Sequence, residues 1–288
     1  MESAVNMEAQ KLVFADADSS FEEGEFIIFG VPFDGTCSFR KGAALAPRSI
    51  REESYTYETY LFEHEIDLET VPFHDLGDVK CQGLQDMIGG VGTTVERILK
   101  VNKFPIIMGG EHSLSPPAIR KFQEVGVVIL DAHLDFRNEY LDEFNSHACA
   151  TRRISELVGI DKVITIGIRS MEKREKEDAD SLKLNYVDAR RLKGRGIEKV
   201  LENIKWDKIY LSIDMDFFDP SYAPGVGNPE YFGFSPEDAK ECVNILAPRL
   251  AGFDICEASP PYDSGNTCSL AARLIREVIA VVKKGKEE

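Results

Sequence analysis

GVVILDAHLD, residues 126–135, passes from an apolar run directly into two acids and a histidine. Continuous apolar runs of this length are typical of strands that are buried on both faces of a parallel sheet. Because side chains two residues apart in an extended chain point to one side, we expect Asp131, His133 and Asp135 to share a target. Taken alone, the triplet fits a solvated strand end equally well, since acidic side chains are usually exposed. The interpretation therefore depends on what the other strands supply.

Similar apolar runs recur along the chain, with helix-like segments between them. The runs lie at residues 26–31, 104–110, 162–169, 208–214 and 251–258, and the helix candidates lie at about 46–60, 89–102, 115–123, 147–158, 236–246 and 267–284. Strands that alternate with crossover helices predict an α/β fold with a largely parallel sheet covered on both faces. We expect a single domain at residues 25–288, preceded by an N-terminal extension at residues 1–24.

Four of these strands are followed by acid or imidazole groups. In open α/β sheets, ligands gather at the carboxyl ends of the strands, so groups that follow different strands can converge on one site. The groups, strand by strand, are Glu111 and His112; Asp131, His133 and Asp135; Asp214 and Asp216; and Glu257. This convergence favours a binding site over a set of solvated strand ends.

The residue types in this set point to metal ions. Four aspartates crowded into one site would repel one another and raise each other's pKa values. Two divalent cations would balance their charge. With two imidazoles and otherwise oxygen ligands, the set suits Mn²⁺ better than a thiolate-selected zinc site, although Co²⁺, Fe²⁺, Ni²⁺ or Zn²⁺ can occupy it under some conditions. A metal pair about 3.5–4 Å apart can hold a bridging hydroxide as a nucleophile.

The composition argues against several other classes of protein. The 288-residue chain has a formal net charge of -16, which opposes nucleic-acid binding and suits either solubility or mild attraction of a cationic small molecule. Its six cysteines are scattered without a CxxC pair and are expected to be reduced packing residues. No apolar run is long enough to cross a membrane, and the acidic N-terminus lacks the pattern of a signal peptide. We therefore expect a cytoplasmic protein.

Four stretches together carry a family resemblance. They are GGEHS (109–113), DAHLD (131–135), SIDMDFFDP (212–220) and GVPFDGTCSFRKGAALAPRSIREES (30–54). The first three, in this order, and the fourth, which precedes them in the chain, resemble the ureohydrolase family, which includes arginase and agmatinase. The resemblance extends from about residue 26 to 283. It implies a three-layer α/β/α arginase-like fold around a parallel sheet. It also implies a homo-oligomer, commonly a trimer or hexamer.

The resemblance further implies a role for each site residue. One metal would be held by His112, Asp131, Asp135 and Asp214, and the other by Asp131, His133, Asp214 and Asp216. Three residues would be catalytic. Asp135 would orient the bridging hydroxide, Glu257 would pair with the substrate guanidinium, and His147 would shuttle protons.

Other interpretations of these polar residues remain open. Glu257 can also be a helix-capping or salt-bridged surface residue, and a lone loop histidine such as His147 is often merely exposed. Asp219 is expected to support its loop rather than to bind metal. His64 and His74 are expected to be structural or solvated, and three tyrosines on a helix, Tyr55, Tyr57 and Tyr60, to be packing residues.

The implied reaction is hydrolysis of a guanidino compound by attack of the bridging hydroxide on the guanidinium carbon. EASPPYD (257–263) resembles the agmatinase pattern, which implies agmatine as substrate, putrescine and urea as products, and a place in polyamine biosynthesis. APGVGNPEYFGFSP (223–236) departs from the family's usual substrate loop, so arginase and guanidinobutyrase activities stay open. A catalytically inactive metal-binding scaffold of the same fold is the alternative from another class.

Overall fold

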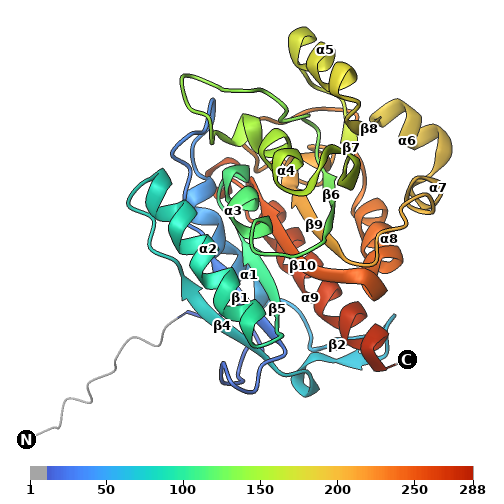
Figure 1. Ribbon diagram of the computed structural model, residues 1–288. Coiled ribbons are helices and arrows are strands. Elements are labelled where there is room, and N and C mark those ends of the chain that lie inside the picture. The colour runs from blue at the N-terminus through green and yellow to red at the C-terminus, as the bar shows by residue number, and fades with distance from the viewer. Residues whose placement is uncertain (1–11, 288) are drawn as a thin grey trace, which may run out of the picture.

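The computed structural model describes residues 12–287 and contains an eight-stranded sheet between two layers of helices (Figure 1). The strand order is β4-β1-β5-β10-β9-β6-β7-β8, and all neighbouring strands are parallel. The strands are β1 (Phe26–Gly30), β4 (Phe73–Asp78), β5 (Phe104–Met108), β6 (Gly126–Leu130), β7 (Val163–Ile168), β8 (Asn185–Asp188), β9 (Ile209–Asp214) and β10 (Leu250–Cys256). A small antiparallel pair, β2 (Tyr60–Leu61) and β3 (Ile66–Asp67), lies outside the sheet. The predicted three-layer α/β/α fold is confirmed.

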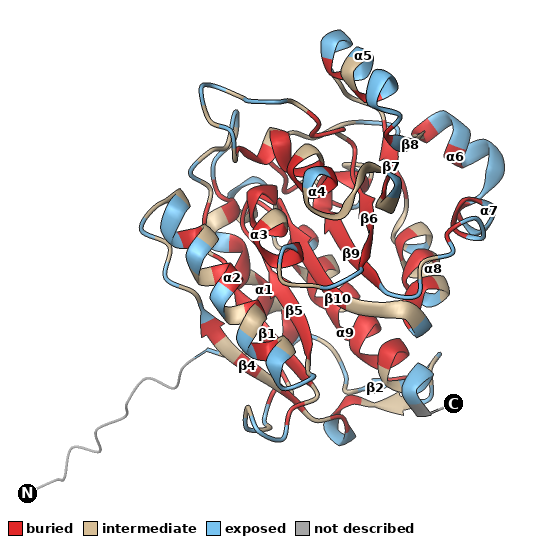
Figure 2. Ribbon diagram, in the orientation of Figure 1, coloured by how far each residue is buried: buried red, intermediate tan, exposed pale blue. Residues whose placement is uncertain are grey.

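The two faces of the sheet form two cores. The α-helices are α1 (Ala46–Ser54), α2 (Leu84–Lys100), α3 (Ser115–Ile119), α4 (Ala150–Val158), α5 (Lys173–Leu182), α6 (Ala189–Arg195), α7 (Ile197–Leu201), α8 (Pro236–Leu246) and α9 (Asn266–Glu287). Side chains of α1 and α6–α9 pack with one face of the strands, and those of α2–α5 pack with the other. The central strands are consequently buried throughout their length (Figure 2), as their continuous apolar sequences predict.

Several elements of the fold were not predicted, for identifiable reasons. The edge strand β4 was missed because it contains a buried acid, Asp75, which forms an ion pair with Arg51 of α1 at 2.7 Å. The other edge strand, β8, is short and only partly buried. Helix α5 has no apolar stripe, since its buried residues are only Glu175 and Ala179. Helices α6 and α7 are also additions to the prediction.

The segment after α1 corrects a second expectation. The helix ends at Ser54 instead of continuing to residue 60, so Tyr55 and Tyr57 lie in the following turn and Tyr60 lies in β2. Tyr55 and Tyr60 are exposed, so the prediction that they pack was wrong. Tyr57 does pack against the core, and its hydroxyl donates a hydrogen bond to the carbonyl of Ser269 at 2.9 Å.

The N-terminal segment is described from residue 12 onward, and residues 1–11 of the expected extension lie outside the described residues. The side chain of Phe14 is fully buried in the core, and its N–H donates to Asp75 at 2.8 Å. His74 bonds to the carbonyl of Ser19, and His64 bonds to Glu277, which confirms structural roles for both histidines. The described start of the chain, from residue 12 to Ser19, therefore packs against the edge strand β4.

All six cysteines are free, and four of them are buried. Within residues 12–287, no helix combines the length and the apolar character needed to cross a bilayer.

Candidate active site

The predicted site residues follow four strands that are neighbours in the sheet, in the order β5-β10-β9-β6. Because the strands are parallel, their carboxyl ends share one edge. His112 follows β5, Glu257 follows β10, Asp214 ends β9, and the DAHLD segment follows β6. The topology thus brings together groups that lie up to 145 residues apart, as the hydrogen bond between His112 and Glu257 shows.

Two clusters of ligand-type atoms lie at this edge. In the first, Nδ1 of His112 lies 3.2 Å from Asp131 Oδ2, 3.3 Å from Asp135 Oδ2 and 3.4 Å from Asp214 Oδ2. In the second, Nδ1 of His133 lies 2.7 Å from Asp216 Oδ2 and 3.9 Å from Asp131 Oδ1. Asp131 belongs to both clusters, and each has the composition and spacing to hold a metal ion.

The backbone that presents these groups differs from the predicted extended chain. Strand β6 ends at Leu130, and Asp135 has a φ of 48°, in the left-handed region. Asp135 therefore does not belong to an extended segment, as the alternation of side chains required, although its carboxylate still reaches the first cluster. Glu257 also has a positive φ, 63°. Such conformations are unfavourable for residues with a Cβ and persist where surrounding contacts hold them, which is common at functional sites.

Hydrogen bonding shows how His112 is oriented. Its Nε2 lies 3.0 Å from the Ser212 hydroxyl, which donates its own proton to Asp254 Oδ1 at 2.6 Å. Ser212 therefore accepts from Nε2–H, and with a cation bound the lone pair of Nδ1 would face that cation together with the three carboxylates. Both Nδ1 and Asp131 Oδ2 are buried without a hydrogen-bond partner. A lone pair directed at carboxylates fits a bound cation, and metal-binding histidines are commonly held through their other nitrogen.

The pKa shifts agree with a site that favours cations. Burial, and repulsion by Asp216, raise the pKa values of Asp131 and Asp214 well above their usual range. Burial opposes ionisation of Asp216 as well, but the neighbouring His133 holds its pKa below the usual range. Divalent cations would relieve the repulsion among these buried acids, so the donor set fits metal ions chemically.

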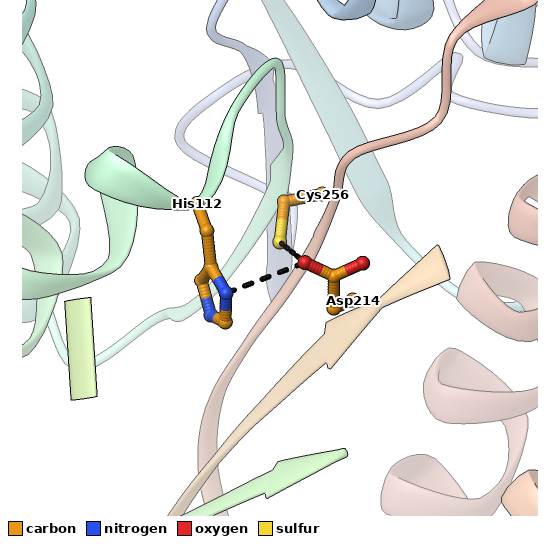
Figure 3. A group of neighbouring side chains, drawn as sticks. All are labelled: His112, Asp214 and Cys256. Carbon is orange, nitrogen blue, oxygen red and sulfur yellow. Dashed lines mark hydrogen bonds and ion pairs between the residues drawn. The ribbon is translucent and has the colours of Figure 1, made fainter. Parts of the chain in front are cut away.

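Cys256 is a neighbour that the motifs did not reveal. Figure 3 shows it beside Asp214 and His112, with its Sγ 3.9 Å from Asp214 Oδ2. Burial, reinforced by the charge of Asp214, raises the pKa of this thiol well above its usual range. The side chain of Cys256 is fully buried and packs beside the first cluster.

A cavity of about 280 Å³ opens above the clusters. Its lining includes His133, Asp135, His147, Asp214, Asp216 and Glu257, and it also includes Arg137, Glu172 and Glu175. His112 and Asp131 lie beneath this wall and are fully buried. The arrangement gives a molecule in the cavity direct access to acids from both clusters.

Glu257 lies in the wall of this cavity, so the alternative of a surface residue was wrong. It is only 8% exposed, and its Oε1 accepts a hydrogen bond from the His112 backbone N–H at 2.7 Å. Its own N–H donates to the carbonyl of Gly110 at 2.8 Å. Burial, and repulsion by Asp214 and Glu111, raise the pKa of Glu257 well above its usual range. A bound cation would stabilise its ionised form.

His147 is likewise part of the cavity wall and not an exposed loop residue. It begins a 3₁₀ turn, His147–Cys149, and is 7% exposed. Its ring contacts the hydroxyl of Thr36 through Nδ1 at 3.2 Å.

The loop between β9 and α8 is held by an arginine that the sequence did not point to and by an aspartate that it did. Nη2 of Arg169 donates to the carbonyls of Asp216 (2.6 Å), Phe218 (3.2 Å) and Glu230 (3.0 Å). Asp219 accepts hydrogen bonds from backbone amides of the same loop, which confirms its predicted supporting role. Arg169 follows β7 without a motif, so nothing in the sequence marked it.

Comparisons with known proteins agree with this geometry. The model of the arginase family matches residues 24–281. The chain is 35% identical over 290 residues to the N(1)-aminopropylagmatine ureohydrolase of Thermococcus kodakarensis, covering 99% of both proteins. It is 32% identical over 277 residues to the agmatinase of Bacillus anthracis, covering 93% of this chain and 95% of that protein. The crystal structure of the agmatine ureohydrolase of Thermoplasma volcanium matches with a TM-score of 0.93 and 40% identity, covering 96% of both chains. The chain therefore belongs to the arginase family.

Proposed function

We propose that this arginase-family hydrolase removes urea from agmatine and leaves putrescine. The observation that carries the proposal is the charge of the cavity wall. Arg137, the only arginine among the described residues that line it, lies 3.8 Å from Glu172 and 3.9 Å from Glu175. With Arg137 neutralised in this way, the wall attracts cations and offers no unpaired arginine or lysine to an α-carboxylate. This charge supports agmatine over arginine or guanidinobutyrate.

Two Mn²⁺ ions are the proposed cofactors, because carboxylate-rich donor sets suit this metal. The first would be held by His112, Asp131, Asp135 and Asp214, and the second by Asp131, His133, Asp214 and Asp216. The clusters described above support this division, since Asp131 belongs to both of them. A bound metal pair supplies a water of lowered pKa as the nucleophile.

The protein's own groups would position the substrate and move its protons. Glu257 would hold the planar guanidinium through paired hydrogen bonds, because one of its oxygens is already oriented by the His112 N–H. Asp135 would accept a hydrogen bond from the nucleophile and aim it at the guanidinium carbon. His147 would deliver a proton to the leaving amine. The products are urea and an uncharged amine that takes up a further proton in solution.

A longer cation is the second candidate substrate. A neighbouring cavity of about 240 Å³ shares Arg137, Glu172 and Glu175 with the first. It is further lined by two acids, Glu139 and Asp178, and by Asn138 and Arg174. An aminopropyl extension on agmatine would carry its additional ammonium group toward these acids. The similarity to the Thermococcus kodakarensis ureohydrolase supports this candidate.

Urea release from a substrate panel tests the proposal. Protein loaded with Mn²⁺ is offered agmatine, N1-aminopropylagmatine, arginine and guanidinobutyrate separately. We expect kcat/KM to be highest for one of the two decarboxylated cations, by about 100-fold or more over arginine, since a buried unpaired carboxylate costs several kcal/mol. A preference for arginine would overturn the substrate assignment. No urea from any of the four would favour the inactive scaffold.

A further inference from the structure

Thr36 connects a buried acid to the histidine of the cavity wall. It lies in the loop after β1, and both its backbone N–H and its hydroxyl donate to Glu111, at 2.8 Å to Oε2 and 2.6 Å to Oε1. Glu111 is 1% exposed and also accepts from the Ser113 hydroxyl at 2.6 Å. On its other side, the Thr36 oxygen lies 3.0 Å from the backbone nitrogen of His147 and 3.2 Å from Nδ1 of its ring.

The number of protons available decides the direction of these bonds. A threonine hydroxyl has one proton, and both oxygens of Glu111 accept hydrogen bonds from Thr36. The short bond to Glu111 therefore uses the hydroxyl proton of Thr36. The remaining lone pairs of Oγ1 can only accept, and they accept from the His147 backbone N–H. The contact with Nδ1 is favourable only if Nδ1 also carries a proton.

We infer that Thr36 is a positioning residue that holds His147 in its Nδ1–H tautomer and so directs the lone pair of Nε2 to the reaction. Among residues 12–287, no hydrogen-bond partner of Nε2 is found. The inference rests on the proposed function, in which His147 moves a proton. It assigns that proton to Nε2, which first accepts it and then delivers it to the leaving amine.

The loop that carries Thr36 is held in place independently of His147. The carbonyl of Phe33 accepts a hydrogen bond from the Glu111 N–H at 2.9 Å. A Cβ on Gly110 would lie 2.0 Å from the same carbonyl oxygen, so the GGEHS segment and the Thr36 loop approach each other closely because position 110 is glycine. These contacts therefore keep Thr36 within hydrogen-bonding distance of Glu111.

Ser146 supplies the competing arrangement. Its hydroxyl lies 3.3 Å from Nδ1 of His147 and would stabilise the opposite tautomer if it donated to that nitrogen. In that case the lone pairs of Nδ1 and of the Thr36 oxygen would face each other at 3.2 Å, which is unfavourable. The two arrangements place the ring proton on different nitrogens and can be separated by spectroscopy.

The test measures the ring nitrogens of His147 directly. The protein is loaded with Mg²⁺, which is diamagnetic, in place of Mn²⁺. The nitrogen-15 chemical shifts of the neutral His147 ring are then expected to show a proton on Nδ1 and none on Nε2. Thr36→Val removes the hydroxyl at nearly the same volume and should give a mixture of tautomers, whereas Thr36→Ser should restore the single form. With Mn²⁺, Thr36→Val should lower kcat for agmatine by about 10- to 100-fold, part of the usual contribution of a general acid or base, while KM stays constant.

Several results would overturn the inference. These are a wild-type ring protonated on Nε2, an unchanged kcat in Thr36→Val, or a loss of kcat that follows a loss of bound Mn²⁺. The wild-type spectrum decides the tautomer even if Thr36→Val does not fold. If the wild-type protein released no urea from any guanidino compound, the proposed function would fail, while the spectrum would still report whether Thr36 sets the tautomer.

Discussion

Asp131→Asn is expected to abolish urea release and to remove both metal ions from the protein. Asp131 is the residue shared by the two clusters, and its buried Oδ2 has no hydrogen-bond partner. The asparagine can still accept the His133 N–H at Oδ1, as Asp131 does at 2.6 Å, so the local backbone is preserved. A metal pair contributes several kcal/mol to such reactions, so we expect kcat to fall by at least about 1000-fold.

The matched control for this substitution is Asp219→Asn. Asp219 also lies just after β9, but its carboxylate accepts from the backbone amides of Ser221 and Gly233. An asparagine oxygen can keep one of these bonds. We expect two Mn²⁺ per chain in this variant, measured by elemental analysis after gel filtration, against less than one in Asp131→Asn. Full metal content in Asp131→Asn would show that Asp131 is not a shared ligand.

Glu257→Gln should separate substrate binding from metal binding. The glutamine oxygen can accept the His112 N–H as Glu257 does, but its amide would place N–H donors against the donors of a guanidinium. Removing one charge from a buried pair costs about 3–5 kcal/mol, which corresponds to a loss of roughly 150- to 5,000-fold in kcat/KM for agmatine. The metal content should stay at the wild-type level.

Steady-state kinetics over a range of agmatine concentrations will check this expectation. Glu257→Asp serves as the comparison, since it keeps the charge on a side chain shorter by one methylene and should lose less activity than the glutamine variant. Wild-type kcat/KM in Glu257→Gln would show that the guanidinium binds elsewhere. A parallel loss of Mn²⁺ would instead place Glu257 in the support of the metal site.

The central part of the fold could be predicted because strands that are buried on both faces have continuous apolar sequences. Strands β5 and β6 are apolar along their whole length, β9 is apolar except for Ser212 and Asp214, and each is buried at every position. The edge strands, β4 and β8, have no such apolar run. Strand β4 contains Asp75 because that acid is neutralised by Arg51, a contact made across the fold and not along the chain.

The candidate site shows the same division. Its aspartates and histidines could be predicted because they directly follow the buried strands, where parallel topology brings them together. Their use as metal ligands remains a prediction. The residues that orient them could not be predicted, since Ser212 and Thr36 act through hydrogen bonds to distant segments. The left-handed backbone of Asp135 was also hidden, because a local pattern does not reveal a conformation stabilised by tertiary contacts.

The most direct test of the metal-dependent mechanism is a titration with Mn²⁺. The protein is first treated with a chelator, and urea release from agmatine is then measured as Mn²⁺ is added. We predict no urea without metal and a rate that reaches its maximum at two bound Mn²⁺ per chain. Full activity in the metal-free protein, or a maximum at one Mn²⁺ per chain, would contradict the account.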